Sequence, residues 1–144
     1  MNETVIAAKI ALANSFVLYF KAQSYHWNVE GMFFSQFHDF FGELYAEVYG
    51  AVDPMAEEIR ALGAYAPRSL NEMYQYKTIN DLSDAESVQD MLADLVNANA
   101  TTIESLNKLF DLLTEQKKQG FADFVAGRID AHEKHGWMLR SFLK

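Results

Sequence analysis

The sequence contains no cysteine, only two prolines and only seven glycines among its 144 residues. The absence of cysteine excludes disulfides, thiolate metal sites and cysteine nucleophiles. The scarcity of proline and glycine, beside a hydrophobic share of 50%, favours helices and argues against disorder. A chain of this length can bury its apolar surface in a single core, and we expect one domain over residues 1–144.

Long apolar runs and an excess of basic residues are also missing. No apolar run approaches the roughly 18 residues that a membrane span needs, and the opening Met-Asn-Glu-Thr lacks the basic region of a signal peptide. We therefore expect a cytoplasmic protein that does not enter a membrane. The formal net charge of −8 repels nucleic acid phosphates and attracts cations, although the same charge would serve solubility alone.

Four stretches carry helical periodicity, and none has the pattern of a strand. They cover residues 3–29, 33–62, 84–116 and 120–143. Ser69 with Glu72 predicts a short extra helix over 70–76, and Ser83 with Glu86 predicts a cap for the third long helix. The long link at 64–82 suits a crossover that runs the length of a bundle. The pattern predicts an all-α four-helix bundle, with this long crossover and a short extra helix between helices two and three.

The second long stretch is apolar on more than one face. A helix that needs a single core shows one apolar stripe, so the surplus predicts a second buried face against another subunit. A bulky loop that covers this face is the alternative. Pro54 lies inside the stretch and predicts a kink between Gly50 and Pro54.

The histidines do not form the usual metal motif of a bundle core. Bundles that hold two metal ions in the core carry Glu-x-x-His, whose spacing directs both ligands inward. None of the four histidines, His26, His38, His132 and His135, has a glutamate three residues before it. A metal centre of that kind within one chain is therefore not expected.

A different set of metal-type residues lies on the second stretch. Asp53 and Glu57 are one helical turn apart and could hold a cation together. His38 is roughly 22 Å from Asp53 along a straight helix, so the two cannot share an ion within one chain. Antiparallel packing across a two-fold axis would bring them together along the seam of residues His38, Gly42, Tyr45, Tyr49, Asp53 and Glu57. His26, at the end of the first helix, could join His38.

Two imidazoles and two carboxylates suit Fe(II), and Zn(II) could serve as a surrogate. Each residue also has an ordinary structural interpretation. A histidine can be a satisfied residue of a partly buried core, and an Asp/Glu pair can be a solvated helix face. The metal site is favoured because the four residues converge in the same symmetric arrangement that the surplus apolar face requires.

These residues carry a family resemblance that spans nearly the whole chain. The run Tyr25-His26-Trp27-Asn28-Val29-Glu30-Gly31, followed by His38, Asp53 and Glu57, resembles the Dps family of ferritin-like proteins, the DNA-protection-during-starvation miniferritins. The stretch from His132 to Arg140 is similar to that family's last helix. The resemblance implies a ferritin-like fold and a homo-oligomeric, dodecameric cage with ferroxidase sites at two-fold interfaces.

In such a site, His26 and His38 of one subunit would hold iron with Asp53 and Glu57 of its mate, as both ligands and catalytic residues. The resemblance implies that hydrogen peroxide, or more slowly oxygen, oxidises Fe(II), and that the cage stores Fe(III) mineral and limits oxidative damage. Trp27 would be a nearby oxidisable ring or an interface packing residue. We expect acidic pores at the three-fold axes, lined by Asp123 with Asp130 or Glu133, or else these carboxylates form a solvated face.

The sequence departs from the family pattern at Gly42, where the family has Asp or Glu four residues after the second histidine. This departure favours an alternative, a storage or structural shell with weakened or lost ferroxidase activity, and it puts a second iron in question. If a ligand is missing, Gly42→Asp should speed oxidation. The basic tails of DNA-binding members are absent, so we expect no DNA binding. A remoter alternative is a different bundle, such as a dimeric signalling module.

Overall fold

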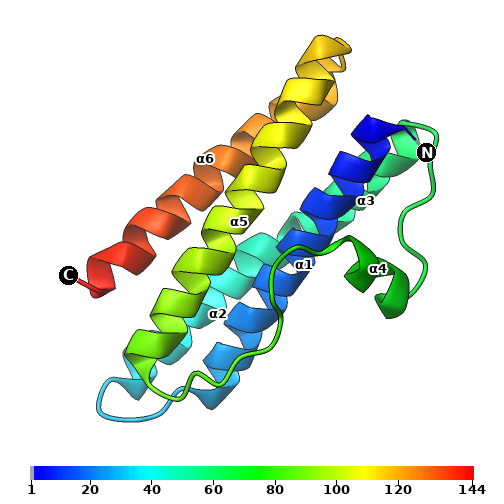
Figure 1. The fold of residues 1–144 in the computed structure, drawn as a ribbon. Helices are drawn as coiled ribbons and strands as arrows, with labels where there is room; N and C mark the ends of the chain where they lie inside the picture. Colours follow the sequence, from blue (N-terminus) through cyan, green and yellow to red (C-terminus); the bar gives the residue numbers. More distant parts are fainter. Residues whose placement is uncertain (1) are drawn as a thin grey trace.

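A computed structural model describes residues 2–144 of the chain, and in that range every regular element is a helix. Four rods form the bundle, and a short helix lies beside them in the crossover (Figure 1). The helices are α1 (Glu3–Asn28), α2 (Phe34–Gly50), α3 (Val52–Ala61), α4 (Leu70–Tyr76), α5 (Val88–Glu115) and α6 (Gln119–Phe142). The predicted architecture is confirmed, including the long crossover and the short helix.

The second rod is made of two helices, as Pro54 predicts. Helix α2 ends at Gly50, Ala51 forms a turn, and α3 starts at Val52. Pro54 thus lies in the first turn of α3, where a missing backbone N–H costs little because that turn has no carbonyl partner for it. The break redirects the carboxylates of α3 relative to the histidine of α2.

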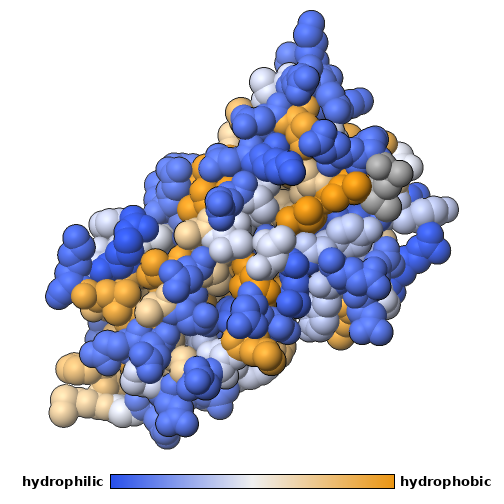
Figure 2. Space-filling model, in the orientation of Figure 1, coloured by the Kyte–Doolittle hydropathy of each residue, from blue (hydrophilic) through white to orange (hydrophobic). Residues whose placement is uncertain are grey.

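Two apolar clusters fill the bundle, one toward each end. One is built around Phe41 and Leu95, the other around Met55 and Leu109, and all four side chains are fully buried. Burying one such side chain stabilises the fold by about 1.5–3 kcal/mol. The face that carries the crossover is largely hydrophilic, with scattered apolar patches (Figure 2).

Helix α1 has no long uninterrupted apolar run, but it is the most apolar of the long helices on average. The helix has 26 residues, and a window of 18 of them has a mean hydropathy of 1.5, so by length and composition alone it could cross a membrane. Small and apolar residues dominate that window, with few charges between them. Within the bundle, 72% of this apolar window is buried, which accounts for its composition, since a central core helix needs the same pattern.

The ends of the crossover are fixed by serine side chains, though one lies away from its predicted place. Ser69 caps α4, and its hydroxyl accepts the Glu72 N–H at 3.1 Å. The predicted Ser83–Glu86 cap is wrong, because α5 begins at Val88 and Ser87 caps it by accepting the Asp90 N–H at 3.1 Å. Ser83 is held elsewhere, since its hydroxyl lies 2.6 Å from the Tyr25 hydroxyl of α1.

A buried asparagine of α1 holds the middle of the crossover. The Asn14 side-chain oxygen accepts the backbone N–H groups of Thr78, at 2.8 Å, and of Ile79, at 3.3 Å. Its amide donates to the Thr78 hydroxyl at 2.9 Å. Asn14 is fully buried, so these bonds replace water that the site excludes.

Replacing Asn14 by alanine should therefore lower the free energy of unfolding by about 2 kcal/mol, because two backbone donors lose their partner. Chemical denaturation followed by circular dichroism measures the change. Asn97→Ala, at an exposed position of α5, is the matched control and should change stability by less than about 0.5 kcal/mol. Equal effects of the two substitutions would show that Asn14 does not hold the crossover.

Candidate metal centre

The structure places His26 beside His38, one in the last turn of α1 and the other in α2. Their rings are stacked, with centroids 3.8 Å apart and planes inclined by 15°. The Nδ1 of His26 lies 2.6 Å from the backbone oxygen of His38, and the Nδ1 of His38 lies 2.7 Å from the backbone oxygen of His26. The two residues therefore hold each other in place reciprocally.

These contacts fix the tautomer of both rings. A carbonyl oxygen only accepts, so each Nδ1 must carry the hydrogen and donate it. In the neutral ring, each Nε2 then keeps its lone pair. A histidine can bind a metal through this atom. A backbone carbonyl that orients a histidine through its second nitrogen is the usual support of a metal-binding imidazole. The pair is thus preorganised as two nitrogen ligands.

Gly42 faces the Nδ1–Cε1 edge of the His26 ring. A Cβ atom at this position would be 3.0 Å from the Nδ1 of His26 and 3.1 Å from its Cε1. Both contacts are tighter than a carbon normally makes, so the glycine permits the close approach of α1 and α2 that stacks the two rings. The departure from the family pattern at Gly42 therefore has a packing reason in this chain.

The two carboxylates lie on the other side of the helix break. Asp53 and Glu57 are both exposed on α3. Within residues 2–144, no three histidine, aspartate or glutamate side chains are gathered closely enough to hold a metal ion. One chain therefore brings together the two histidines of the predicted set, and it leaves Asp53 and Glu57 as a separate pair.

Aromatic rings surround the histidine pair. Tyr45 lies 5.3 Å from the ring of His26, and Phe34 is stacked on His38 at 4.9 Å. Tyr19 contacts Tyr45 and Tyr49, with ring centroids at 6.2 and 4.7 Å. Large apolar side chains on this part of α1, α2 and their connection remain exposed, namely Phe20, Trp27, Phe33, Phe34 and Tyr49. Several large exposed apolar side chains on neighbouring elements are typical of a subunit interface.

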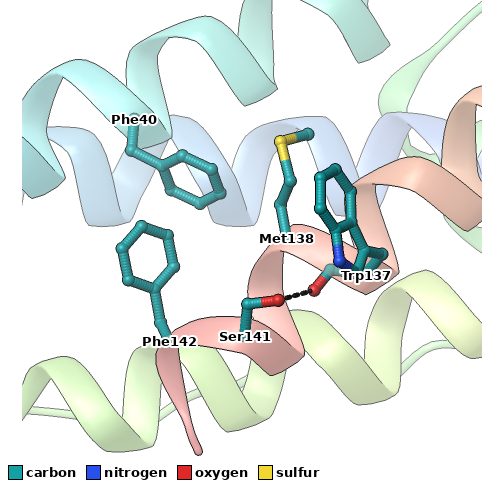
Figure 3. Close-up of a pocket in the computed structure, with 5 residues that line it drawn as sticks. All are labelled: Phe40, Trp137, Met138, Ser141 and Phe142. Carbon is teal, nitrogen blue, oxygen red and sulfur yellow. Dashed lines mark hydrogen bonds between the residues drawn. The ribbon is translucent and has the colours of Figure 1, made fainter.

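A pocket of about 350 Å³ lies between α2 and the end of α6 (Figure 3). Phe40 faces Phe142 across it, with ring centroids 4.9 Å apart, and Trp137, Met138 and Ser141 complete its walls. None of these side chains is charged or a usual metal ligand. The pocket is therefore mainly apolar.

The sequence analysis missed a polar cluster between α2 and α6. The Arg128 guanidinium forms two hydrogen bonds with the Glu47 carboxylate, at 2.6 and 2.9 Å, and His135 lies 2.7 Å from the same carboxylate. His132 is fully buried beside them and is also held by Asn99. The sequence does place Arg128, His132 and His135 on one face of the last helix, and this spacing could have indicated a polar cluster. Nothing in the spacing indicated that Glu47 would be its partner.

The cluster shifts the titration of two of its members. The hydrogen bond from His135, followed by those from Arg128, holds the pKa of Glu47 far below its usual range. Burial, followed by the positive charge of Arg128, lowers the pKa of His132 to about 3. His132 is therefore neutral at physiological pH, and Glu47 is ionised.

Comparisons with known proteins agree with this architecture. Residues 9–144 match the model of the ferritin-like domain family, Ferritin. A low temperature-induced protein of Nostoc sp. is 35% identical over 135 residues, which cover 92% of this chain and 75% of that protein. The DNA protection during starvation protein of Brevibacillus brevis is 32% identical over 133 residues, which cover 92% of this chain and 89% of that protein.

Comparison with solved structures points to the same family. The crystal structure of a Dps protein from Vibrio cholerae O1, described as a member of the ferritin-like diiron-carboxylate superfamily, aligns with a TM-score of 0.93 at 27% identity. The alignment covers 99% of this chain and 89% of that one. The shared fold, the ferritin-like domain match and the identity to a DNA protection during starvation protein agree with one another. The chain belongs to the Dps family of ferritin-like proteins.

Proposed function

We propose that this protein is an iron-sequestering miniferritin that oxidises Fe(II) at two-fold interfaces between its subunits and stores the Fe(III) product. The observation that supports this most strongly is the stacked pair His26 and His38, whose Nε2 atoms are both free to bind metal. The pair lies on an apolar exposed surface, as expected where a second copy of the chain would pack.

The second copy would supply the oxygen ligands. Asp53 and Glu57 are on α3, beyond the break at Ala51, and antiparallel packing of two second rods would set them against the histidines of the mate. Two nitrogen and two oxygen donors suit Fe(II), and Zn(II) should compete for the same place. Iron is the substrate here: hydrogen peroxide accepts two electrons, one from each of two Fe(II) ions, and its O–O bond breaks to give two hydroxide ions.

We further propose that residues 1–144 act as one ferritin-like unit of a dodecameric cage in the cytoplasm. The exposed aromatic surface of α1 and α2 would form the two-fold contact. Asp123, with Asp130 or Glu133, would line the entry pores, and all three side chains are exposed on α6 of the isolated chain.

Mixing Fe(II) with hydrogen peroxide under anaerobic conditions, and following the absorbance of the ferric product, tests the activity directly. Particle size is measured on the same sample. Rapid oxidation by a particle near twelve subunits is the expected result. An assembled cage that oxidises Fe(II) no faster than buffer would support the storage or structural shell that Gly42 suggests. A monodisperse monomer would contradict both functions.

Gly42 offers a sharper test of the histidine pair. Gly42→Ala should slow oxidation about three- to tenfold with particle size unchanged, because its Cβ displaces the ring of His26. Gly42→Asp carries the same Cβ and adds a carboxylate, so Ala rather than the wild type is its steric reference. Faster Fe(II) oxidation by Gly42→Asp than by Gly42→Ala would show that the added carboxylate serves as a ligand. Equal oxidation rates of Gly42→Ala and the wild type would show that oxidation does not depend on the stacked arrangement of His26 and His38.

DNA binding is not expected. Each copy contributes a formal charge of −8, and Lys9, the first basic residue of the sequence, is buried within α1. A gel-shift assay with duplex DNA at about 150 mM salt and without divalent cations should show no complex. A retained band under those conditions would reveal a basic surface that the sequence does not suggest.

A further inference from the structure

The orientation of the histidine pair depends on the backbone of the last turn of α1. The Nδ1 of His38 donates to the backbone oxygen of His26 at 2.7 Å, so the direction of the His38 ring follows the position of that oxygen. The last carbonyls of a helix have no partners within it, and a helix end is therefore held weakly by its own hydrogen bonds. A contact from outside α1 is needed to fix this turn.

Tyr25, the residue before His26, makes such a contact. Its side chain is 4% exposed and packs against Phe41 of α2, with ring centroids 6.2 Å apart. Its hydroxyl is hydrogen-bonded to the Asp94 carboxylate of α5 and lies 2.6 Å from the Ser83 hydroxyl in the crossover. One side chain thus joins the last turn of α1 to three other parts of the chain.

The direction of each hydrogen bond in this group follows from the chemistry of the acceptors. An ionised carboxylate only accepts, so the Tyr25 hydroxyl donates to Asp94. The Ser83 hydroxyl must then donate to the Tyr25 oxygen, and its own oxygen accepts the Ala85 N–H at 3.2 Å. The buried Lys21 ammonium pairs with the same Asp94 oxygen at 2.8 Å and balances its charge. Every donor of the group therefore has an acceptor, which favours a single arrangement.

The Tyr25–Phe41 contact and the His26–Gly42 approach are adjacent pairs on the same two helices. Gly42 follows Phe41 in α2, and a Cβ atom at Gly42 would be 3.0 Å from the His26 Nδ1. Because the two pairs are neighbours where α1 meets α2, a displacement of Tyr25 from Phe41 also displaces His26 from Gly42. Close packing leaves little room for such a shift, so the placement of Tyr25 determines that of His26.

We propose that Tyr25 is a positioning residue for the iron site, and that it acts by fixing the turn of α1 on which His26 and His38 both depend. Its hydroxyl is engaged by Asp94 and Ser83, so it is not itself a ligand. This inference rests on the proposed function, because it treats the two histidines as ligands. Removing the hydroxyl should loosen the pair without removing a ligand, so Fe(II) should bind more weakly while oxidation of bound iron changes little.

Tyr25→Phe is the direct test, since it removes the hydroxyl and keeps the ring on Phe41. In the assembled protein, the Fe(II) concentration for half-maximal oxidation by hydrogen peroxide should rise about three- to tenfold, and the maximal rate should stay within about twofold. Titration with Zn(II) alone should show the same loss of affinity, and the His26→Ala, His38→Ala variant defines the binding that does not depend on the pair. Ser83→Ala removes one of the two hydroxyl bonds and should raise the half-maximal Fe(II) about twofold.

Two controls separate positioning from a loss of stability. Tyr65→Phe makes the same chemical change at an exposed side chain between α3 and α4, and it should leave the Fe(II) dependence unchanged. Asn14→Ala frees the middle of the crossover and lowers stability, so it shows what general loosening does to the site. Its half-maximal Fe(II) concentration should equal that of the wild type.

A Tyr25→Phe variant that is less stable but needs no more Fe(II) than the wild type would overturn the positioning role, and so would an equal shift in Asn14→Ala. If Tyr25→Phe does not assemble, Ser83→Ala decides the question, since an unchanged Fe(II) dependence there would also overturn the role. Failure of the proposed function looks different. The wild type would then need the same Fe(II) as the His26→Ala, His38→Ala variant, and both proposals would be overturned together.

Discussion

Cages reassembled from equal amounts of two inactive variants should recover about a quarter of wild-type Fe(II) oxidation. One variant carries His26→Ala and His38→Ala, and the other carries Asp53→Ala and Glu57→Ala. Each variant alone lacks half the ligands at every site. After unfolding, mixing and reassembly, about half of the two-fold interfaces should be mixed. Each mixed interface has one complete site and one empty site.

This recovery depends on the separation of the two half-sites. His26 and His38 are stacked at the junction of α1 and α2, whereas Asp53 and Glu57 lie beyond the break at Ala51. If every ligand of a site came from one chain, no subunit of the mixture would hold a complete set. Zero recovery, in cages that mass spectrometry shows to contain both variants, would therefore end the two-chain hypothesis.

The sequence predicted the helices well because their apolar spacing is regular and their connections are marked. Pro54 located the break in the second rod, and Ser69 with Glu72 located α4. The start of α5 was less predictable. Ser83 and Ser87 both lie shortly before the helix; Ser83 contacts the Tyr25 hydroxyl of α1, and Ser87 caps α5. A contact between residues so distant in sequence leaves no local pattern.

The candidate site is predictable from the sequence only in part. The spacing of His38, Asp53 and Glu57 on one stretch predicts that a site there needs two chains, and the structure of one chain brings together only His26 and His38. The steric role of Gly42 was not available from spacing, because it depends on how closely α1 approaches α2. The Glu47–Arg128 pair was also missed, since its members lie on α2 and α6 and either could equally have been a solvated surface residue.

Acid should destabilise the fold well above the range in which its carboxylates become protonated. His132 is fully buried, and burial together with Arg128 lowers its pKa from 6.5 to about 3. Above pH 6.5 the ring is neutral in both the folded and unfolded chain, so it adds no pH dependence there. Below that pH the unfolded chain binds a proton that the folded chain cannot, and the free energy of unfolding must fall as the pH falls.

The slope from this one group approaches about 1.4 kcal/mol per pH unit, so roughly 2–3 kcal/mol should be lost between pH 6.5 and 4.5. Denaturant unfolding at a series of pH values measures the slope. His132→Gln should lower stability at pH 7, because the partners Asn99 and Arg128 are disturbed, and it should remove most of the slope in this window. The His26→Ala, His38→Ala variant should keep that slope, since both histidines lie at the junction of α1 and α2, outside this cluster. A His132→Gln slope equal to that of the wild type would show that His132 takes up its proton as readily in the folded chain as in the unfolded one.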